Sequence, residues 1–505
     1  MVDIRSSIRP VHLKVLLLSF LLAGQVTCTD NQPTNLRIVN NPPFEPGTSD
    51  KVTVDGITWY FDKAYPVGTF ANGDYWVAGD TVVITKISPD FDGQHHGWEV
   101  NPVVEGGQGF SIDLNNFEPS LVPTLPYKAI PVSSIVKTIR SDKVRGYICR
   151  QCIQTAAVLT IVSQPVSDTT LFRPPYVGTE KPFYSTKDLR TDLLPSLSPA
   201  ENTPAFSSFS EISNLQLDHK NGATGTELHP INSFVDDYGA YIGMRNADAA
   251  LRLMLNDALT QKMPLLISYV QYGIDLLYLL PLGFRYEDGG GHRPGQKLPM
   301  VFAAVMLDDA EMKQKLKKSV HLFHEKILLN YNHDSTKILF GDDQDLSASL
   351  HEENYWKVLR SFIKDGTFAG YKSYRDPYGY IDGGGYPGSN YQYCCTSQPW
   401  KGSVLAVKLM PALYDVWNDT ITIRYVERWV ESGAHSQPDP CAPADSSWEN
   451  YGKTYGPDGN GGCIKDMDTT DGIGRFPKEH GKYVDEGHYR SNFQKSLWNT
   501  YYHLK

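Results

Sequence analysis

The chain has 505 residues and a formal net charge of −10, with 41% hydrophobic and 21% charged residues. This composition is typical of globular proteins, and the length exceeds what one hydrophobic core usually holds, so we expect two domains or one large two-part unit. The acidic balance argues against a nucleic-acid partner, because contacts with phosphates require a basic surface.

The first 28 residues predict a secretory signal peptide. Arg5, Arg9 and Lys14 precede the apolar run VLLLSFLLAG, and small or weakly polar residues follow as far as Cys28. This run is too short to span a bilayer, although a lipid anchor on Cys28 is an alternative. We therefore expect a secreted, extracellular protein with no membrane contact after the signal peptide is removed. The Asn-Asp-Thr sequon at 418–420 would carry a glycan in a eukaryotic host.

Of the seven cysteines, Cys28 ends this segment and six follow it, an even number that predicts disulfides in a secreted chain. Cys441 with Cys463 and Cys149 with Cys152 are the pairs that the spacing favours. The first pair would close a loop rich in Gly, Pro and Asp.

Residues 29–200 predict a β-rich domain, which we expect to be a β-sandwich. Aromatic and β-branched residues alternate with Gly, Asn and Asp turns in the stretch GITWYFDKAYPVGTFANGDYWVAGDTVVITKI. A buried strand is predicted at 156–163, AAVLTIVS. Proline-rich and Ser/Pro/Thr-rich stretches end this part. Residues 201–240 then predict a linker that also forms the rim of a cleft.

Residues 241–505 predict a helical domain. In NADAALRLMLNDALTQ the apolar residues recur at helical spacing, with Asn246 and Asp248 where an N-cap and a charge favoured by the helix dipole belong. Residues 263–282 are apolar nearly all round, so this helix should be buried on all sides. Buried and amphipathic segments alternate afterwards, which indicates antiparallel hairpins. The expected fold class is α+β multidomain, with an N-terminal β-sandwich followed by an α-helical (α/α) toroid.

The expected buried helix carries a polar stripe. Ser268, Gln271, Asp275 and Tyr278 lie at i, i+3, i+7 and i+10, on one face. A buried carboxylate is costly unless it is paired or faces water, so Asp275 needs a partner. Two explanations are open: Asp275 caps or bridges a neighbouring helix, or the stripe lines the cavity of the toroid and contacts substrate.

Three polar segments flank the expected helices. In residues 284–297, FRYEDGGGHRPGQK, three glycines are followed by a histidine and two cations, Arg293 and Lys297. Residues 371–395 contain seven tyrosines, whose flat apolar faces and hydroxyls suit sugar rings. Residues 217–250 crowd histidines, acids and tyrosines before the first helix. Each segment also has an ordinary interpretation: a solvated surface loop, a rigid structural wrap or a polar connector.

Two mechanisms fit these residues. In β-elimination from a uronate polymer, a base removes the proton next to the carboxylate, and a cation or amide stabilises the enolate. In glycoside hydrolysis, two carboxylates flank the scissile bond. The catalytic residues that we expect are His292, Tyr238, Tyr241, His229 and Asp275. The substrate-binding residues that we expect are Gln271, Arg293, Lys297, Asn221, Asp382, Tyr380 and Tyr386.

Motifs for cofactors and metals are missing or incomplete. HEENY at 351–355 lacks the second histidine of a zinc-protease helix, and no nucleotide-binding glycine motif is present. DMDTTDG at 466–472 approaches a calcium loop, but its third acid falls one position late. We therefore expect no cofactor and no metal.

Five stretches carry a resemblance: GITWYFDKAYPVGTFANGDYWV, FRPPYVGTEK, VQYGIDLLYLL, GGGHRPGQKLPMVFAAVML and YQYCCTSQPWKGSVLAVKLM. Together they resemble a group of secreted proteins from marine and environmental bacteria. The β-then-α layout is similar to that of carbohydrate-active enzymes built on an α/α toroid, including polysaccharide lyases and glycoside hydrolases. This resemblance implies a polysaccharide partner, and it transfers no catalytic residue.

We therefore expect a secreted carbohydrate-active protein that cleaves an extracellular polysaccharide, such as a uronate polymer, by β-elimination or hydrolysis. The alternative is a non-catalytic matrix or wall protein that binds polysaccharide or mineral. The chain lacks the long Asp/Glu runs of a surface that templates mineral, which argues against the mineral version.

Overall fold

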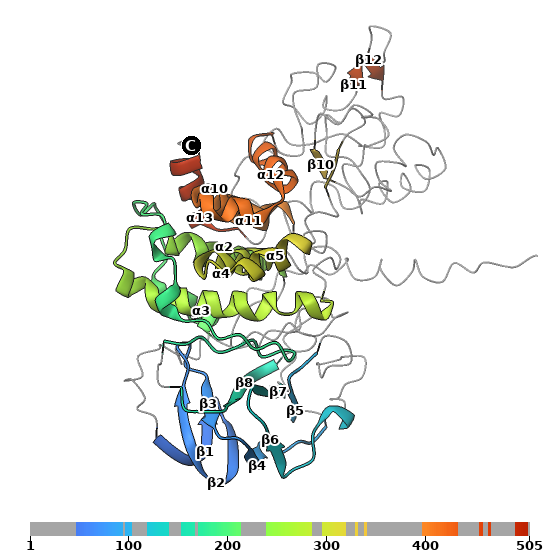
Figure 1. Ribbon diagram of the computed structural model, residues 1–505. Helices are drawn as coiled ribbons and strands as arrows, with labels where there is room; N and C mark the ends of the chain where they lie inside the picture. Colours follow the sequence, from blue (N-terminus) through green and yellow to red (C-terminus); the bar gives the residue numbers. More distant parts are fainter. Residues whose placement is uncertain are drawn as a thin grey trace, which may run out of the picture. The chain divides into compact units, whose positions relative to one another are not determined.

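The computed structural model describes residues 47–93, 96–103, 119–140, 153–166, 170–213, 239–284, 295–319, 329–331, 338–340, 396–432, 454–457, 463–465 and 490–502. Figure 1 labels the helices and strands of these segments. An N-terminal β-sheet region is followed by helices, in the order that the sequence predicts.

Eight strands form one curled sheet in the order β5-β7-β8-β3-β2-β4-β6, with β1 paired to β2. Paired strands are antiparallel, except that β3 and β8 are parallel. The strands are β1 Gly47–Val54, β2 Ile57–Thr69, β3 Tyr75–Ala78, β4 Val82–Ser88, β5 His96–Val100, β6 Tyr127–Ala129, β7 Ser133–Arg140 and β8 Ile153–Val162.

The curl of the sheet originates in β2. Ser49 of β1 pairs with Tyr65, whereas Lys51 pairs with Tyr60. An interval of two residues in β1 therefore lies opposite an interval of five residues in β2, which is a β-bulge. Such a bulge bends a strand and increases its twist. Before the bulge β2 pairs with β4, and after it β2 pairs with β3. The described strands therefore join in one curled sheet and do not close the two-sheet sandwich that the sequence predicts.

The two faces of the sheet belong to different hydrophobic cores, because successive side chains of a strand point to opposite faces. Ile135 and Leu159 point into the curl and cluster there with Trp59 and Trp98. The neighbouring Val136 and Val158 point the other way and belong to the same core cluster as the helices. Burial of the outer face thus couples the sheet to the helical part.

Residues 170–213 follow the sheet and bond to both parts. The Ala71 amide donates to the Leu171 carbonyl at 2.8 Å, and the Arg190 amide donates to the Met306 carbonyl at 2.7 Å. This connecting segment contains the short 3-10 helices η3 Thr186–Asp188, η4 Thr191–Leu193 and η5 Phe206–Ser213.

The helices supply most of the larger core. Residues Leu259–Leu282 are long and apolar enough to cross a membrane, but 83% of the apolar window is buried, and a core helix passes the same test. The helices are α2 Gly239–Leu253, α3 Leu259–Leu277, α4 Lys297–Met306, α5 Ala310–Lys318, α10 Ser397–Leu409, α11 Pro411–Trp417, α12 Thr420–Ser432 and α13 Asn492–Tyr501. Shorter elements are η2 Pro119–Leu121, η6 Leu280–Leu282, the pair β9 Leu329–Tyr331 with β10 Ile338–Phe340, and the pair β11 Thr454–Pro457 with β12 Cys463–Lys465.

Two details differ from the sequence prediction. The helix α2 begins at Gly239, so Asn246 lies inside it, fully buried, and is not its N-cap. Tertiary burial has overridden the local capping signal of an asparagine. An α/α toroid is not shown by the helices of the described segments, because much of 320–395 and 433–489 lies outside them.

Close packing of α3 against α4 gives a first prediction. At Gly273, a Cβ atom would lie 2.2 Å from the Pro299 carbonyl oxygen and 2.7 Å from the Ala303 Cβ. Gly273→Ala is therefore expected to lower the free energy of unfolding by about 1–3 kcal/mol, despite the better helix propensity of alanine. Urea unfolding measures the change, and the double variant with Ala303→Gly should recover part of it. Unchanged stability of Gly273→Ala would contradict the close approach.

Candidate functional site

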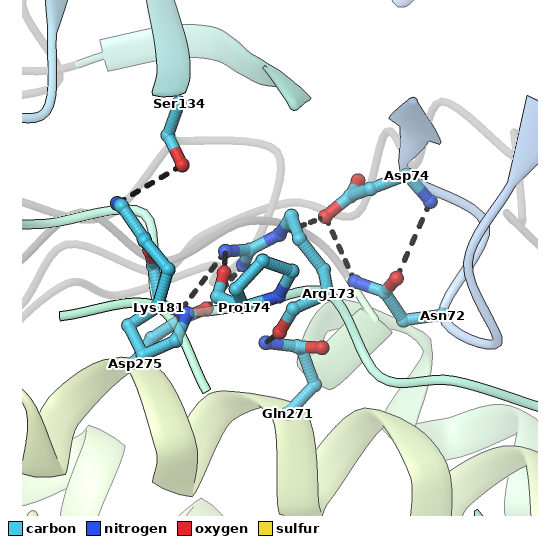
Figure 2. Close-up of polar contacts among 9 residues, drawn as sticks. Asn72, Asp74, Ser134, Arg173, Pro174, Lys181, Gln271 and Asp275 are labelled. Carbon is cyan, nitrogen blue, oxygen red and sulfur yellow. Dashed lines mark hydrogen bonds and ion pairs between the residues drawn. The ribbon is translucent and has the colours of Figure 1, made fainter. Parts of the chain in front are cut away.

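Arg173 lies at the centre of a buried charge network (Figure 2). Its Nε donates to Oδ2 of Asp74 at 2.6 Å, next to the start of β3. Its Nη1 donates to Oδ1 of Asp275 at 3.1 Å, and its Nη2 donates to Oδ2 of the same carboxylate. One guanidinium of the connecting segment thus joins a carboxylate of the sheet to a carboxylate of α3.

Amides orient the members of this network. The Asn72 side chain donates to Oδ2 of Asp74 at 2.8 Å, and Nε2 of Gln271 donates to the Arg173 carbonyl at 3.0 Å. Figure 2 shows Gln271 and Asp275 reaching up from the same helix toward Arg173. These hydrogen bonds fix the guanidinium in the bidentate geometry that arginine and carboxylate pairs favour.

Burial and charge act on the network in opposite directions. Burial disfavours the charge of Arg173, but Asp275 and Asp74 outweigh this effect and raise the pKa of the guanidinium. Burial raises the pKa of Asp275, and the guanidinium works against this rise. We take Asp275 as ionised, because it accepts two hydrogen bonds from a cation that stays charged at any relevant pH.

Lys181 lies beside this network. Its Nζ donates to Oγ of Ser134 at 3.1 Å and to the carbonyls of Pro175 and Val177 at 2.6 and 3.1 Å. Burial lowers the pKa of Lys181 to about 7, with the neighbouring charge of Arg173 adding to the effect. The amine therefore sits where its charge is disfavoured, and carbonyl oxygens compensate for part of the lost hydration.

The polar stripe of α3 faces the connecting segment. Gln271 and Asp275 contact Arg173, and the hydroxyl of Tyr278 shares a hydrogen bond of 2.7 Å with Tyr184. The fourth member, Ser268, bonds within its own helix. Of the two explanations that the sequence leaves open for Asp275, this geometry favours the bridging role, with a loop arginine as the partner. Catalysis by Asp275 would require its carboxylate to leave Arg173.

A second polar region lies on the other side of α3, where α4 packs against Gly273. Gly295, two residues before α4, has φ +87°, and a Cβ there would lie 2.3 Å from Cα of Gly243 in α2. The Asn246 side-chain amide donates to the Gly295 carbonyl at 3.5 Å. The helix α4 therefore begins beside the first two turns of α2.

The starts of α4 and α10 both contact the first part of α12. Lys297, the first residue of α4, has its Nζ 4.0 Å from Oδ2 of Asp419 and 4.2 Å from the ring centre of Trp417. Ser397, the first residue of α10, shares a hydrogen bond of 2.7 Å with the Tyr425 hydroxyl. Asp419 immediately precedes α12, and Tyr425 lies about 9 Å further along the helix axis. The start of α4 thus lies at the beginning of α12, and the start of α10 lies at its second turn.

The starts of α2, α4 and α10 lie in or directly after the three polar segments that the sequence singles out. Two expected site residues are described there: Tyr241, half-buried in the first turn of α2, and Lys297, which is buried. Gln271 and Asp275 belong instead to the Arg173 network. The other expected residues lie outside the described segments: Tyr238, His229, His292, Arg293, Asn221, Asp382, Tyr380 and Tyr386.

Sequence reasoning missed Arg173, Asp74, Ser397 and Tyr425. An arginine before two prolines reads as an exposed loop, and nothing local signals its burial. Ser397 carries more local signal, because a Thr-Ser pair with a proline two positions later favours the start of a helix.

No family model, no curated protein and no solved structure matches the chain. The resemblance to secreted bacterial proteins and the similarity of layout to toroid enzymes therefore stay predictions. Function has to be inferred from the helix starts and from the chemistry of the residues around them.

Asp248 is a further buried acid, where α13 packs on α2. Its Oδ1 accepts a hydrogen bond of 2.8 Å from Nε2 of Gln494, and Nη1 of Arg245 lies 3.8 Å from its Oδ2. Burial raises the pKa of Asp248 to about 6, although Arg245 opposes the rise. The carboxyl group is therefore held in a place that favours its protonated form.

We expect Asp248→Asn to gain stability relative to the wild type as the pH rises. Because the folded-state pKa exceeds the unfolded one, the stabilising contribution of the protonated acid is complete below the unfolded value of 3.8 and is lost as the pH rises through about 6. Between pH 4.5 and 7 the difference in free energy of unfolding should shift by about 2 kcal/mol in favour of the variant. Urea unfolding of both proteins at the two pH values measures the shift, and a difference independent of pH would contradict the raised pKa.

Proposed function

We propose that the protein is a secreted carbohydrate-active enzyme that cleaves an extracellular polysaccharide. Two contacts carry this proposal: α4 begins beside the first two turns of α2, and the starts of α4 and α10 both contact the first part of α12. In the sequence, Tyr238 immediately precedes α2, and His292 and Arg293 stand three and two positions before Gly295. Groups from three separate segments can therefore meet at one end of these helices. We also propose that the helices belong to an α/α toroid, whose further hairpins would come from outside the described segments.

Of the two mechanisms, we favour β-elimination. A neutral imidazole, His229 or His292, would take the proton next to the uronate carboxylate, and Tyr238 or Tyr241 would protonate the leaving oxygen. Arg293 would stabilise the negative charge of the enolate, since a guanidinium keeps its charge at any working pH.

A non-catalytic protein that binds polysaccharide in a matrix or wall is the second candidate, and the state of Asp275 favours it. Hydrolysis needs two carboxylates at the scissile bond. Asp275 is 3% exposed, and both of its oxygens are bound to Arg173, which is the arrangement of a structural pair. If the remaining acids are also structural, hydrolysis is excluded, and the chain binds sugars without cleaving them unless the histidines and tyrosines perform elimination.

A panel of acidic and neutral polysaccharides, incubated with the purified mature chain, tests the proposal. Absorbance from an unsaturated product identifies a lyase, and new reducing ends without that absorbance identify a hydrolase. Binding without either product would replace the enzyme by the matrix protein.

A further inference from the structure

The corner between α11 and α12 contains the one N-glycosylation sequon of the sequence, Asn418-Asp419-Thr420. Such a sequon can be used only on the surface of a chain that enters the secretory pathway, because a bulky hydrophilic glycan cannot be buried. The first 28 residues predict this entry. Whether the sequon can carry a glycan in the folded protein therefore depends on the exposure of its residues.

The two residues that the sequon requires are exposed, and the residue between them is buried. Asn418 and Thr420 are exposed, whereas Asp419 is only 4% exposed. Asp419 accepts hydrogen bonds from the amides of Ile421 and Thr422 at 3.1 and 3.2 Å, so it caps the start of α12. The position whose identity a sequon leaves open thus serves the fold, and the positions that it fixes remain accessible from the solvent.

Asn418 lies at the point where α11 ends. It has the left-handed conformation, with φ 50°, and its amide donates to the Tyr414 carbonyl at 3.3 Å. Asparagine and glycine are the residues that most readily end a helix in this way. Glycine would serve the turn equally well, but asparagine also brings a side-chain amide to an exposed corner, where a glycan has room.

Tyr414, one helical turn before Asn418, offers an aromatic ring next to the sequon. Residues four apart on a helix are neighbours, and Tyr414 is 40% exposed. Its ring presents an apolar face, which suits the apolar face of a sugar ring. A sugar attached to Asn418 would therefore remove apolar surface of Tyr414 from water, which is favourable.

We infer that Asn418 carries an N-linked glycan whose first N-acetylglucosamine covers the ring of Tyr414. In the transfer, the side-chain nitrogen of Asn418 forms a bond to C1 of this sugar and loses a proton. The bond from C1 to the diphosphate of a lipid-linked oligosaccharide breaks, and the lipid diphosphate leaves. The inference rests on the predicted secretion, in a eukaryotic cell, and goes beyond the proposed function because it requires no cleavage of a polysaccharide.

Secretion of the full chain from a eukaryotic host cell, followed by mass spectrometry of the peptide with Asn418, tests the site. Most of the secreted chains are expected to carry the glycan. The matched control Thr420→Ala keeps Asn418 but breaks the sequon, so its peptide should be bare. If residues 1–28 do not direct secretion, a signal peptide of the host replaces them. A bare Asn418 in the secreted wild type overturns the inference, whereas the polysaccharide panel above decides the proposed function independently.

Two enzymes test the contact with Tyr414. An endoglycosidase leaves one N-acetylglucosamine on Asn418, and an amidase removes the whole glycan. The trimmed protein should keep its melting temperature, and the stripped protein should melt about 1 °C lower or more. The amidase also converts asparagine to aspartate, so the bare Thr420→Ala protein shows the effect of losing the sugar without that change.

The variant Tyr414→Ala should remove the difference between the trimmed and the stripped protein. The same substitution at Leu259, which is 45% exposed at the start of α3, is the control and should leave this difference intact. Equal melting temperatures of the trimmed and stripped wild type would refute the role of Tyr414. A difference that persists in Tyr414→Ala would refute it as well.

Discussion

Arg173→Met is expected to lower the free energy of unfolding by about 3–5 kcal/mol, the largest loss of stability that we predict for a single substitution. Methionine fills much of the same space, but Asp74 and Asp275 lose the guanidinium that binds both of them. Two buried carboxylates then remain close together without a cation between them. Urea unfolding measures the loss, which should shrink in acid as the carboxylates become protonated.

Two comparison variants separate charge pairing from packing. Adding Asp74→Asn and Asp275→Asn to Arg173→Met removes the unpaired charges, so most of the lost stability should return. Arg190 also binds two carboxylates, Asp192 and Asp308, but its side chain is 41% exposed. Arg190→Met should therefore cost much less, because water can solvate the released acids. Equal losses for the two arginine variants would refute the argument from burial.

The location of strands and helices follows well from local patterns in the sequence. Residues 263–282 predict a buried helix, and α3 with the turn after it occupies this stretch. The curl of the sheet was not predictable, because it depends on which residues of β1 and β2 pair across the bulge near Tyr65. Register of this kind is set by contacts between strands and leaves no local signature.

The candidate site also depends on contacts between residues far apart in the sequence, which local patterns do not predict. Helical spacing correctly groups Gln271 and Asp275 on one face, since the period of an α-helix is a local property. What that face contacts depends on Arg173, which lies 102 residues from Asp275 in the sequence. The burial of Gln398 in the first turn of α10 is likewise a property of the packed chain, because it depends on the helices around it; among the described residues its amide has no hydrogen-bond partner.

His292→Ala is expected to lower kcat at least 100-fold while leaving the melting temperature nearly unchanged. A general base contributes about 10²- to 10⁴-fold to a proton transfer, and alanine offers no substitute for the imidazole. The readout is the rate of unsaturated product on the polysaccharide that the panel identifies. His96→Ala, the same substitution on strand β5 of the sheet, is the control and should retain turnover.

Comparison with Asp275→Asn makes the test of His292 decisive. Asp275 contributes through its pair with Arg173, so its loss should lower the melting temperature and should affect turnover only through the folded fraction. A base at His292 predicts the opposite pattern, with turnover lost and stability kept. If Asp275→Asn abolishes turnover in the folded protein while His292→Ala remains active, the buried carboxylate is a reacting group after all, and hydrolysis replaces elimination as the favoured mechanism.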